Sequence, residues 1–120
     1  MIDHITLHVS DFEKSKAFYT SILSVLGYNL LADLVEHKVA GYGKERPEFW
    51  IAENPAKVGG QPHVGLIAGT KEQIHAFYEI ALAHGATDNG SPGPRPEYGP
   101  TYYAAFILTP EGYNIEAALS

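Results

Sequence analysis

The chain has 120 residues and a formal net charge of −6, which is the size of one ordinary domain. The lack of cysteine excludes a disulfide scaffold, a thiolate nucleophile and a cysteine-based zinc site. Eight Lys and Arg against fourteen Asp and Glu argue against a nucleic-acid or anionic-membrane surface, and no apolar run approaches the roughly 18 residues of a membrane span. Because Asp3 stands where a signal peptide would have basic residues, we expect a cytoplasmic protein with no nucleic-acid or membrane partner.

The first predicted strand covers residues 2–9, where apolar and polar side chains alternate. The capping-box pattern Ser10-x-x-Glu13 predicts that a helix starts directly after this strand, and Gly27 predicts where it ends. The inner face of that helix is predicted from helical spacing to consist of Ala17, Phe18, Ile22 and Leu26. Three further strands, over residues 28–35, 37–43 and 47–53, fit a meander.

The second half of the chain repeats the first. Residues 4–23 align without a gap with residues 63–82 at an offset of 59, and seven of the twenty positions are identical, where unrelated segments would match at about one. The identical pairs are His4/His63, Leu7/Leu66, Glu13/Glu72, Ala17/Ala76, Phe18/Phe77, Tyr19/Tyr78 and Leu23/Leu82. The chain is therefore predicted to be one domain made of two modules, about 1–54 and about 62–120, joined by a linker at about 54–61.

Module two begins with a predicted strand over residues 63–68 and a predicted helix between the capping box Thr70-x-x-Gln73 and Gly85. The inner face of this helix is predicted to be Ile74, Phe77, Tyr78, Ala81 and Leu82. Three Gly and four Pro within residues 86–101 predict an ordered surface loop, and a hairpin is predicted over 102–108 and 113–119. The order of a strand, a helix and further strands thus occurs twice, which indicates an α+β fold whose sheets curve around something.

Two histidines and one glutamate are the candidate metal ligands. The helix must cover the apolar face of its sheet, so His4 is expected to point away from the helix, and by the repeat His63 does the same. Glu116 is the one acid in an otherwise apolar final strand, and a buried carboxylate is usually paired or metal-bound. Two imidazoles and a carboxylate form a three-point site for a divalent ion and leave positions open for water or substrate.

Further residues are candidates for contact with a small-molecule substrate. His8 shares a face with His4, and Trp50 either lines a cavity or packs in the core. A cation and aromatic side chains lie in and after the Gly/Pro loop, where they suit a small organic anion or an aromatic ligand, or simply hold the loop together; they are Arg95, Tyr98, Tyr102 and Tyr103. Glu97, Tyr98 and Tyr102 are conceivable general acids or bases, but nothing in the sequence positions them, so the catalytic residues stay unknown.

The opening His4-Ile-Thr-Leu-His-Val-Ser-Asp11, followed by Ser15-Lys-Ala-Phe18-Tyr19 and Leu26-Gly27-Tyr28, resembles that of vicinal oxygen chelate proteins. The closing Pro110-Glu-Gly112-Tyr-Asn-Ile-Glu116 resembles the usual ending of that superfamily, and the likeness covers essentially the whole chain. The superfamily includes glyoxalase I, fosfomycin-resistance proteins, bleomycin-resistance proteins and extradiol dioxygenases.

The resemblance implies two βαβββ modules that form a U-shaped, partly open barrel or cup around a divalent metal, Zn, Ni, Mn or Fe. The family's ligand positions fall on His4, His63 and Glu116. Glyoxalase I usually adds a glutamate late in module one, but the matching position lies near Trp50, which favours a His/His/Glu site; Glu48 would take that place only in an alignment shifted by two residues. The resemblance also implies a homodimer, with metal ligands from one or both subunits.

The function expected from these observations is a metal-dependent enzyme of the glyoxalase-like class. Its substrate would be a small molecule that chelates the metal through adjacent oxygens, in lyase, isomerase or dioxygenase chemistry. The alternative is a metal-free binding protein of the bleomycin-resistance type, which sequesters its ligand without reacting with it.

Overall fold

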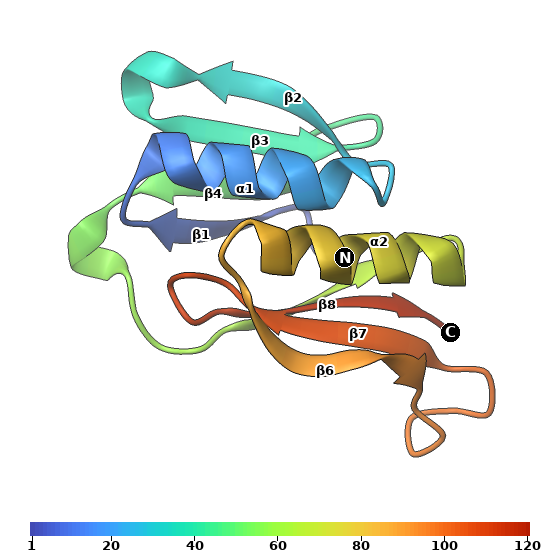
Figure 1. Ribbon diagram of the computed structural model, residues 1–120. Helices are drawn as coiled ribbons and strands as arrows, with labels where there is room; N and C mark the ends of the chain where they lie inside the picture. Colours follow the sequence, from blue (N-terminus) through green and yellow to red (C-terminus); the bar gives the residue numbers. More distant parts are fainter. The chain divides into compact units, whose positions relative to one another are not determined.

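The computed structural model describes residues 1–120 and divides into two compact units, Met1–Val58 and Gly59–Ser120. Each unit is a four-stranded sheet with one long helix, built in the order βαβββ, so the predicted α+β fold of two such modules is confirmed. Figure 1 shows α1 lying over one face of its own sheet, and α2 over one face of the other. Neither helix is long and apolar enough to cross a membrane. That both modules form one domain stays a prediction.

Unit one carries a mixed sheet in the order β1-β4-β3-β2, in which β1 runs parallel to β4 and the other pairs are antiparallel. The long elements are β1 (Ile5–Val9), α1 (Phe12–Ser24), β2 (Asn29–Leu34), β3 (Val39–Gly43) and β4 (Phe49–Glu53). A single 3₁₀ turn, η1 (Val35–His37), joins β2 to β3. The predicted strands and their order are therefore confirmed. The buried strand residues include Leu7, Val9, Ala40, Tyr42 and Ile51.

Unit two repeats this topology, with the sheet order β5-β8-β7-β6 and β5 parallel to β8. Its elements are β5 (His63–Ile67), α2 (Lys71–Ala83), β6 (Thr87–Pro94), β7 (Tyr103–Leu108) and β8 (Asn114–Leu119), and a second 3₁₀ turn, η2 (Pro55–Lys57), precedes them. The offset of 59 residues found in the sequence carries α1 onto α2, each of 13 residues. The internal repeat is thus a structural repeat.

The buried faces of the two helices differ from the prediction at a few positions. Phe18, Ile22 and Leu26 are buried as predicted, and so are the α2 residues Ile74, Phe77 and Ala81. The prediction that Ala17 and Leu82 pack against the core was wrong, because Ala17 is exposed and Leu82 is 37% exposed. Tyr78 is half-buried. Each exposed residue stands next to a buried one, about 100° round the helix from it, and so falls beside the narrow apolar stripe.

The start of α2 has the predicted capping box, whereas α1 uses a different cap. Thr70 Oγ1 accepts from the Gln73 backbone N–H at 3.1 Å, and Gln73 Oε1 accepts from the Thr70 N–H at 3.1 Å. In α1 the cap is Asp11, whose carboxylate accepts from the Lys14 N–H at 3.1 Å, so the prediction of Ser10 was wrong by one residue. A carboxylate at a helix start also interacts favourably with the helix dipole, which a serine hydroxyl does much less.

Removing the Thr70 cap gives a first test of this reading. Thr70→Ala leaves the Gln73 N–H without its acceptor, and we expect it to lower the free energy of unfolding by about 1 kcal/mol. The midpoint of urea unfolding measures the change. Thr70→Ser keeps a hydroxyl at this position and is expected to stay close to the original midpoint. An unchanged midpoint for Thr70→Ala would show that the cap contributes nothing to stability.

Residues 86–101 were predicted as loop throughout, and this was wrong for Thr87–Pro94, which form β6. The strand pairs only with β7 and lies at the edge of its sheet, with register shifts between Asp88 and Gly90 and between Gly90 and Gly93. Edge strands and bulges are the places where a sheet accepts proline and glycine. The N–H that proline lacks is not needed on the open side of an edge strand, and glycine adopts the unusual backbone angles of a bulge. The Gly and Pro residues of Thr87–Pro94 therefore belong to an irregular edge strand.

Candidate functional site

The register of β5 and β8 brings a histidine and a carboxylate of unit two together. The strands are parallel, with His63 opposite Asn114 and Gly65 opposite Glu116. Ile115 and Ala117 are completely buried, and Glu116 points to the other face of the sheet, where it is still only 5% exposed. Its Oε1 lies 2.9 Å from Nε2 of His63. The structure therefore places two of the three predicted metal ligands in direct contact.

Tyr102, just before β7, binds the other oxygen of the same carboxylate. Its hydroxyl donates to Glu116 Oε2 at 2.6 Å. This hydrogen bond, together with burial, raises the pKa of Tyr102 to about 12, so the phenol stays protonated at neutral pH and remains a donor. Tyr98 is exposed and packs the edge of its ring against Tyr102, with ring centroids 5.5 Å apart. Two of the predicted substrate-contact residues thus lie around Glu116.

Asn114 supports His63 from the side opposite Glu116. Its Nδ2 lies 3.0 Å from His63 Nδ1, while its Oδ1 is buried without a hydrogen-bond partner. Half a turn of the amide exchanges its oxygen and nitrogen, and Oδ1 then accepts a hydrogen bond from Nδ1–H. That tautomer leaves the Nε2 lone pair facing Glu116. Histidines that bind a metal commonly donate their other N–H to such an oxygen, so Asn114 can hold His63 in the form a metal needs.

The distance between the two side chains also fits a shared ion. Nitrogen and oxygen ligands lie about 2.0–2.2 Å from a divalent metal, so two of them at a right angle are about 3 Å apart. The observed 2.9 Å between His63 Nε2 and Glu116 Oε1 matches that separation. No cluster of three or more His, Asp or Glu side chains is brought together in the structure. The same 2.9 Å also fits a direct hydrogen bond between the two side chains, so the role of this pair in a metal site stays a prediction.

His4 lies in unit one, beside an ionised carboxylate. Its Nδ1 is 2.7 Å from Asp3 Oδ1, and Arg46 donates to the other Asp3 oxygen at 3.1 Å. The hydrogen bond with His4, and to a smaller extent the one from Arg46, holds the pKa of Asp3 below its usual range. A carboxylate at Nδ1 fixes the tautomer whose Nε2 carries a lone pair. His4 thus has the partner typical of a ligating histidine, and its place in the predicted metal site stays a prediction.

The strand registers also identify which residue of unit one corresponds to Glu116. In unit one Thr6 lies opposite Trp50, and in unit two Gly65 lies opposite Glu116. Thr6 and Gly65 are equivalent positions of the two modules, because they are 59 residues apart. Trp50 therefore occupies the position equivalent to Glu116. An indole has a donor N–H and no lone pair for a metal, so unit one offers no carboxylate at the place where unit two has one.

An open pocket of about 400 Å³ lies over this part of unit one. It is lined by Asp3, His4, Thr6, Val39, Pro47, Trp50 and Ala52, which come from β1, β3, β4 and the segments beside them. His8 stands further along β1, opposite Ala52, and is half-buried. The pocket thus brings Trp50 and His4 together, whereas His8 is not part of its lining.

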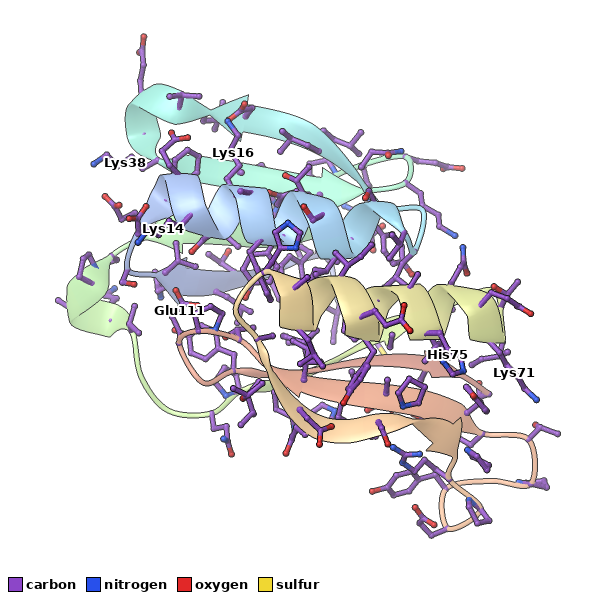
Figure 2. All side chains as sticks on the ribbon, in the orientation of Figure 1. Lys14, Lys16, Lys38, Lys71, His75 and Glu111 are labelled. Atoms are coloured by element: carbon purple, nitrogen blue, oxygen red, sulfur yellow. The ribbon has the colours of Figure 1, made fainter.

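Arg95 lies over the ring of Phe106, which also contacts His63, whereas Tyr103 is engaged elsewhere in unit two. The guanidinium of Arg95 donates to the carbonyls of Ser91 and Gly93 at 2.8 and 2.9 Å and stacks on the ring of Phe106. Tyr103 has the opposite parity to Tyr102 along the chain, and its hydroxyl lies 2.7 Å from Nε2 of His75 on α2. Figure 2 shows His75 and Lys71 at the start of that helix. The structure therefore separates Tyr103 from Glu116.

Two supporting residues were missed by the sequence reading. Asn114 has the same strand parity as Glu116 and stands two residues before it, so it was bound to share that face. Asp3 directly precedes His4. Both signals were present, but a pairing between neighbouring strands depends on register, which the sequence alone left open.

A duplicated βαβββ chain with a histidine on an opening strand and a glutamate on its closing strand defines a class of proteins, and the comparisons agree. The model of the Glyoxalase/Bleomycin resistance protein/Dioxygenase superfamily matches residues 1–117. The chain belongs to this superfamily.

Two solved structures and one curated protein illustrate the relationship. A probable lactoylglutathione lyase from Vibrio cholerae is 30% identical over 126 residues, which cover 94% of this chain and 86% of that protein. The crystal structure of a glyoxalase/bleomycin resistance protein from Albidiferax ferrireducens is 28% identical, with a TM-score of 0.81 over 97% of this chain and 96% of its own. A lactoylglutathione lyase from Agrobacterium tumefaciens, at 17% identity and a TM-score of 0.68 over 98% of this chain and 92% of its own, shares the fold.

Proposed function

We propose that this protein is a divalent-metal-dependent enzyme of the glyoxalase-like class that acts on a small substrate chelating through adjacent oxygens. His4, His63 and Glu116 would hold the ion, which we take to be Zn, Ni, Mn or Fe. The observation that carries the proposal is the 2.9 Å approach of His63 Nε2 to the buried Glu116 carboxylate. A buried carboxylate is costly unless it is paired, and one of the two partners of Glu116 is an imidazole, a group suited to a metal site.

The side chains around this pair have separate tasks. A bound divalent ion would polarise a carbonyl oxygen or acidify a water molecule. Glu116 accepts a hydrogen bond from Tyr102, which keeps one carboxylate oxygen oriented and holds a proton next to the site. Asn114 fixes the ring of His63 from the other side. Together they hold the two ligands in place before a substrate arrives, which is what catalysis by a fixed polar site requires.

The reaction class is proposed from both the relatives and the difference at Trp50. The likeness to a probable lactoylglutathione lyase favours lyase or isomerase chemistry on a substrate with adjacent oxygens. Because Trp50 stands at the position equivalent to Glu116, where glyoxalase I usually has a glutamate, we expect a site with three protein ligands. Dioxygenase chemistry is the variant that applies when the ion is iron.

A metal-free binding protein is the second candidate, and the pocket beside Trp50 favours it. That pocket has an aromatic side chain and about 400 Å³ of space, which suits a sequestered ligand without any chemistry. The two candidates differ in their need for a metal, so metal binding decides between them. We also propose that the protein is a homodimer, in which the three ligands come from one chain or from two; light scattering would give its mass.

Metal uptake is the direct test of the enzyme proposal. Protein without a metal-binding tag is freed of metal with a chelator and titrated with Zn²⁺, Ni²⁺, Mn²⁺ and anaerobic Fe²⁺ in a calorimeter. We expect one ion per chain for at least one of these metals, and the loaded protein to bind 2-hydroxy and 2-oxo acids more tightly than the metal-free form. Absence of stoichiometric uptake for all four metals would reject the enzyme and leave the binding protein.

A further inference from the structure

A glycine on the neighbouring strand leaves room for the Trp50 ring. Gly41 on β3 pairs with Trp50 on β4, and a Cβ built on Gly41 would lie 2.9 Å from Cε3 and Cζ3 of the indole. The same Cβ would lie 2.9 Å from Cβ of Pro47. Real side chains essentially never come so close, so only glycine leaves room for the ring here. The indole therefore covers Gly41, with Pro47 beside it.

This arrangement leaves part of the indole open. Tyr42 and Ile51, which are next to Gly41 and Trp50 along the strands, are 1% and 0% exposed. Trp50 itself is half-buried and lines the pocket. Strand alternation places Trp50 on the face of the sheet away from α1, because Phe49 and Ile51 on either side of it are buried. The ring therefore lies on the uncovered face of its sheet, opposite α1, where it offers an aromatic surface to a ligand.

The lining of the pocket has two chemical characters. Val39, Pro47, Trp50 and Ala52 are apolar, while Asp3, His4 and Thr6 come from β1 and the residues before it. Its volume of about 400 Å³ falls within the usual range for small-molecule sites, which are largely apolar with a few polar groups that orient the ligand. A molecule with a flat apolar part and a polar head matches this lining.

From this geometry we infer that the substrate carries an aromatic ring, which stacks on Trp50 while its chelating oxygens reach toward His4. The position of the oxygens rests on the proposed function; the ring site does not. Stacked aromatic pairs add a factor of about two to ten in affinity beyond the area they bury. A ring-bearing ligand should therefore bind clearly tighter than its methyl analogue.

The test uses two matched pairs of probes that differ only in a phenyl or a methyl group. Mandelate and lactate share a 2-hydroxy acid head, and benzyl alcohol and ethanol lack a chelating carboxylate. Trp50 is the only tryptophan, so its indole N–H gives a single, assignable NMR signal in ¹⁵N-labelled protein. The chelating pair is titrated into zinc-loaded protein, and the alcohol pair into metal-free protein. Calorimetry gives the affinities of the acids.

We expect mandelate to bind at least about ten-fold tighter than lactate, and benzyl alcohol but not ethanol to shift the Trp50 signal. Trp50→Leu should reduce the ratio of mandelate to lactate affinity to about two or less, whereas Trp50→Phe, which keeps a ring, should retain most of it. Unfolding midpoints of both variants confirm that each is folded.

The outcomes separate this inference from the proposed function. If none of the four metals binds but benzyl alcohol still shifts the Trp50 signal, the enzyme proposal fails and the aromatic site stands. If both acids bind the zinc-loaded protein equally and no ring-bearing probe moves the Trp50 signal, the inference is wrong and the enzyme proposal stands. A Trp50 that acrylamide cannot quench, because a second copy or another part of the chain covers it, also overturns the inference.

Discussion

Replacing His63 by alanine is expected to lower the affinity for a divalent ion by at least about 100-fold, and so to abolish uptake at micromolar metal. In the proposed metal site the imidazole would supply the nitrogen ligand next to Glu116, and loss of even a supporting residue of a metal site commonly costs 10- to 100-fold. The fold should survive, because the His63 side chain is 47% exposed and lies on the face of the sheet opposite to that of Ile115 and Ala117, which are completely buried. Calorimetric titration of metal-free protein measures the change.

His75→Ala is the matched control for this experiment. His75 belongs to the same unit and is also half of a hydrogen-bonded pair, with Tyr103, but it sits on α2, as Figure 2 shows, and not beside Glu116. Its replacement should leave metal affinity within about two-fold of the original protein. Asn114→Leu should give an intermediate loss of about 10-fold, since Asn114 only orients the His63 ring. Full metal content in His63→Ala would remove His63 from the ligand set.

The contact between His63 and Glu116 shows how far the sequence could lead. Strand parity and the repeat predicted that His63 faces away from the helix, and Glu116 stood out as the one acid of the final strand. Their 2.9 Å separation required the register of β5 against β8, which pairs strands about 50 residues apart. Nothing local fixes such a register. The internal repeat helped, since it showed that the two opening histidines hold the same place in their modules.

The edge strand β6 shows where local reading failed. Its residues Pro92, Gly93 and Pro94 are turn formers by propensity, and by that measure the stretch is a loop. Pairing with β7 overrides the propensity, because β7 has free backbone groups on that side and an edge position tolerates bulges. By contrast Gly27 and Gly85, with φ of 86° and 100°, end their helices as predicted, since a left-handed residue is a local requirement that glycine meets best.

A similar limit applies to Trp50. The sequence left it open whether this residue packs in the core or lines a cavity, because one tryptophan in an alternating strand fits both. Gly41, nine residues earlier, decides between core packing and cavity lining, because its lack of a side chain makes room for the ring on the sheet face opposite α1. The pairing of β3 with β4, which the sequence does not specify, is what brings Gly41 under the Trp50 ring.

Phe77→Ala is expected to lower the free energy of unfolding by about 3–5 kcal/mol, a large part of the stability of a chain of this size. Phe77 is completely buried on α2, which packs on β6, β7 and β8, and the removed ring leaves a cavity that fully buried neighbours on these strands cannot fill without moving. Urea unfolding followed by circular dichroism measures the loss.

Leu82→Ala, on the same helix, is the matched control. The sequence pattern assigned Leu82 and Phe77 to one inner face, but Leu82 is 37% exposed, so its truncation should cost less than about 1 kcal/mol. Equal losses for the two variants would contradict the burial seen here and restore the broader apolar face that the sequence predicted. Because the sheet under α2 carries His63 and Glu116 on its other face, Phe77→Ala should also lower the temperature at which metal binding is lost, whereas Leu82→Ala should leave it nearly unchanged.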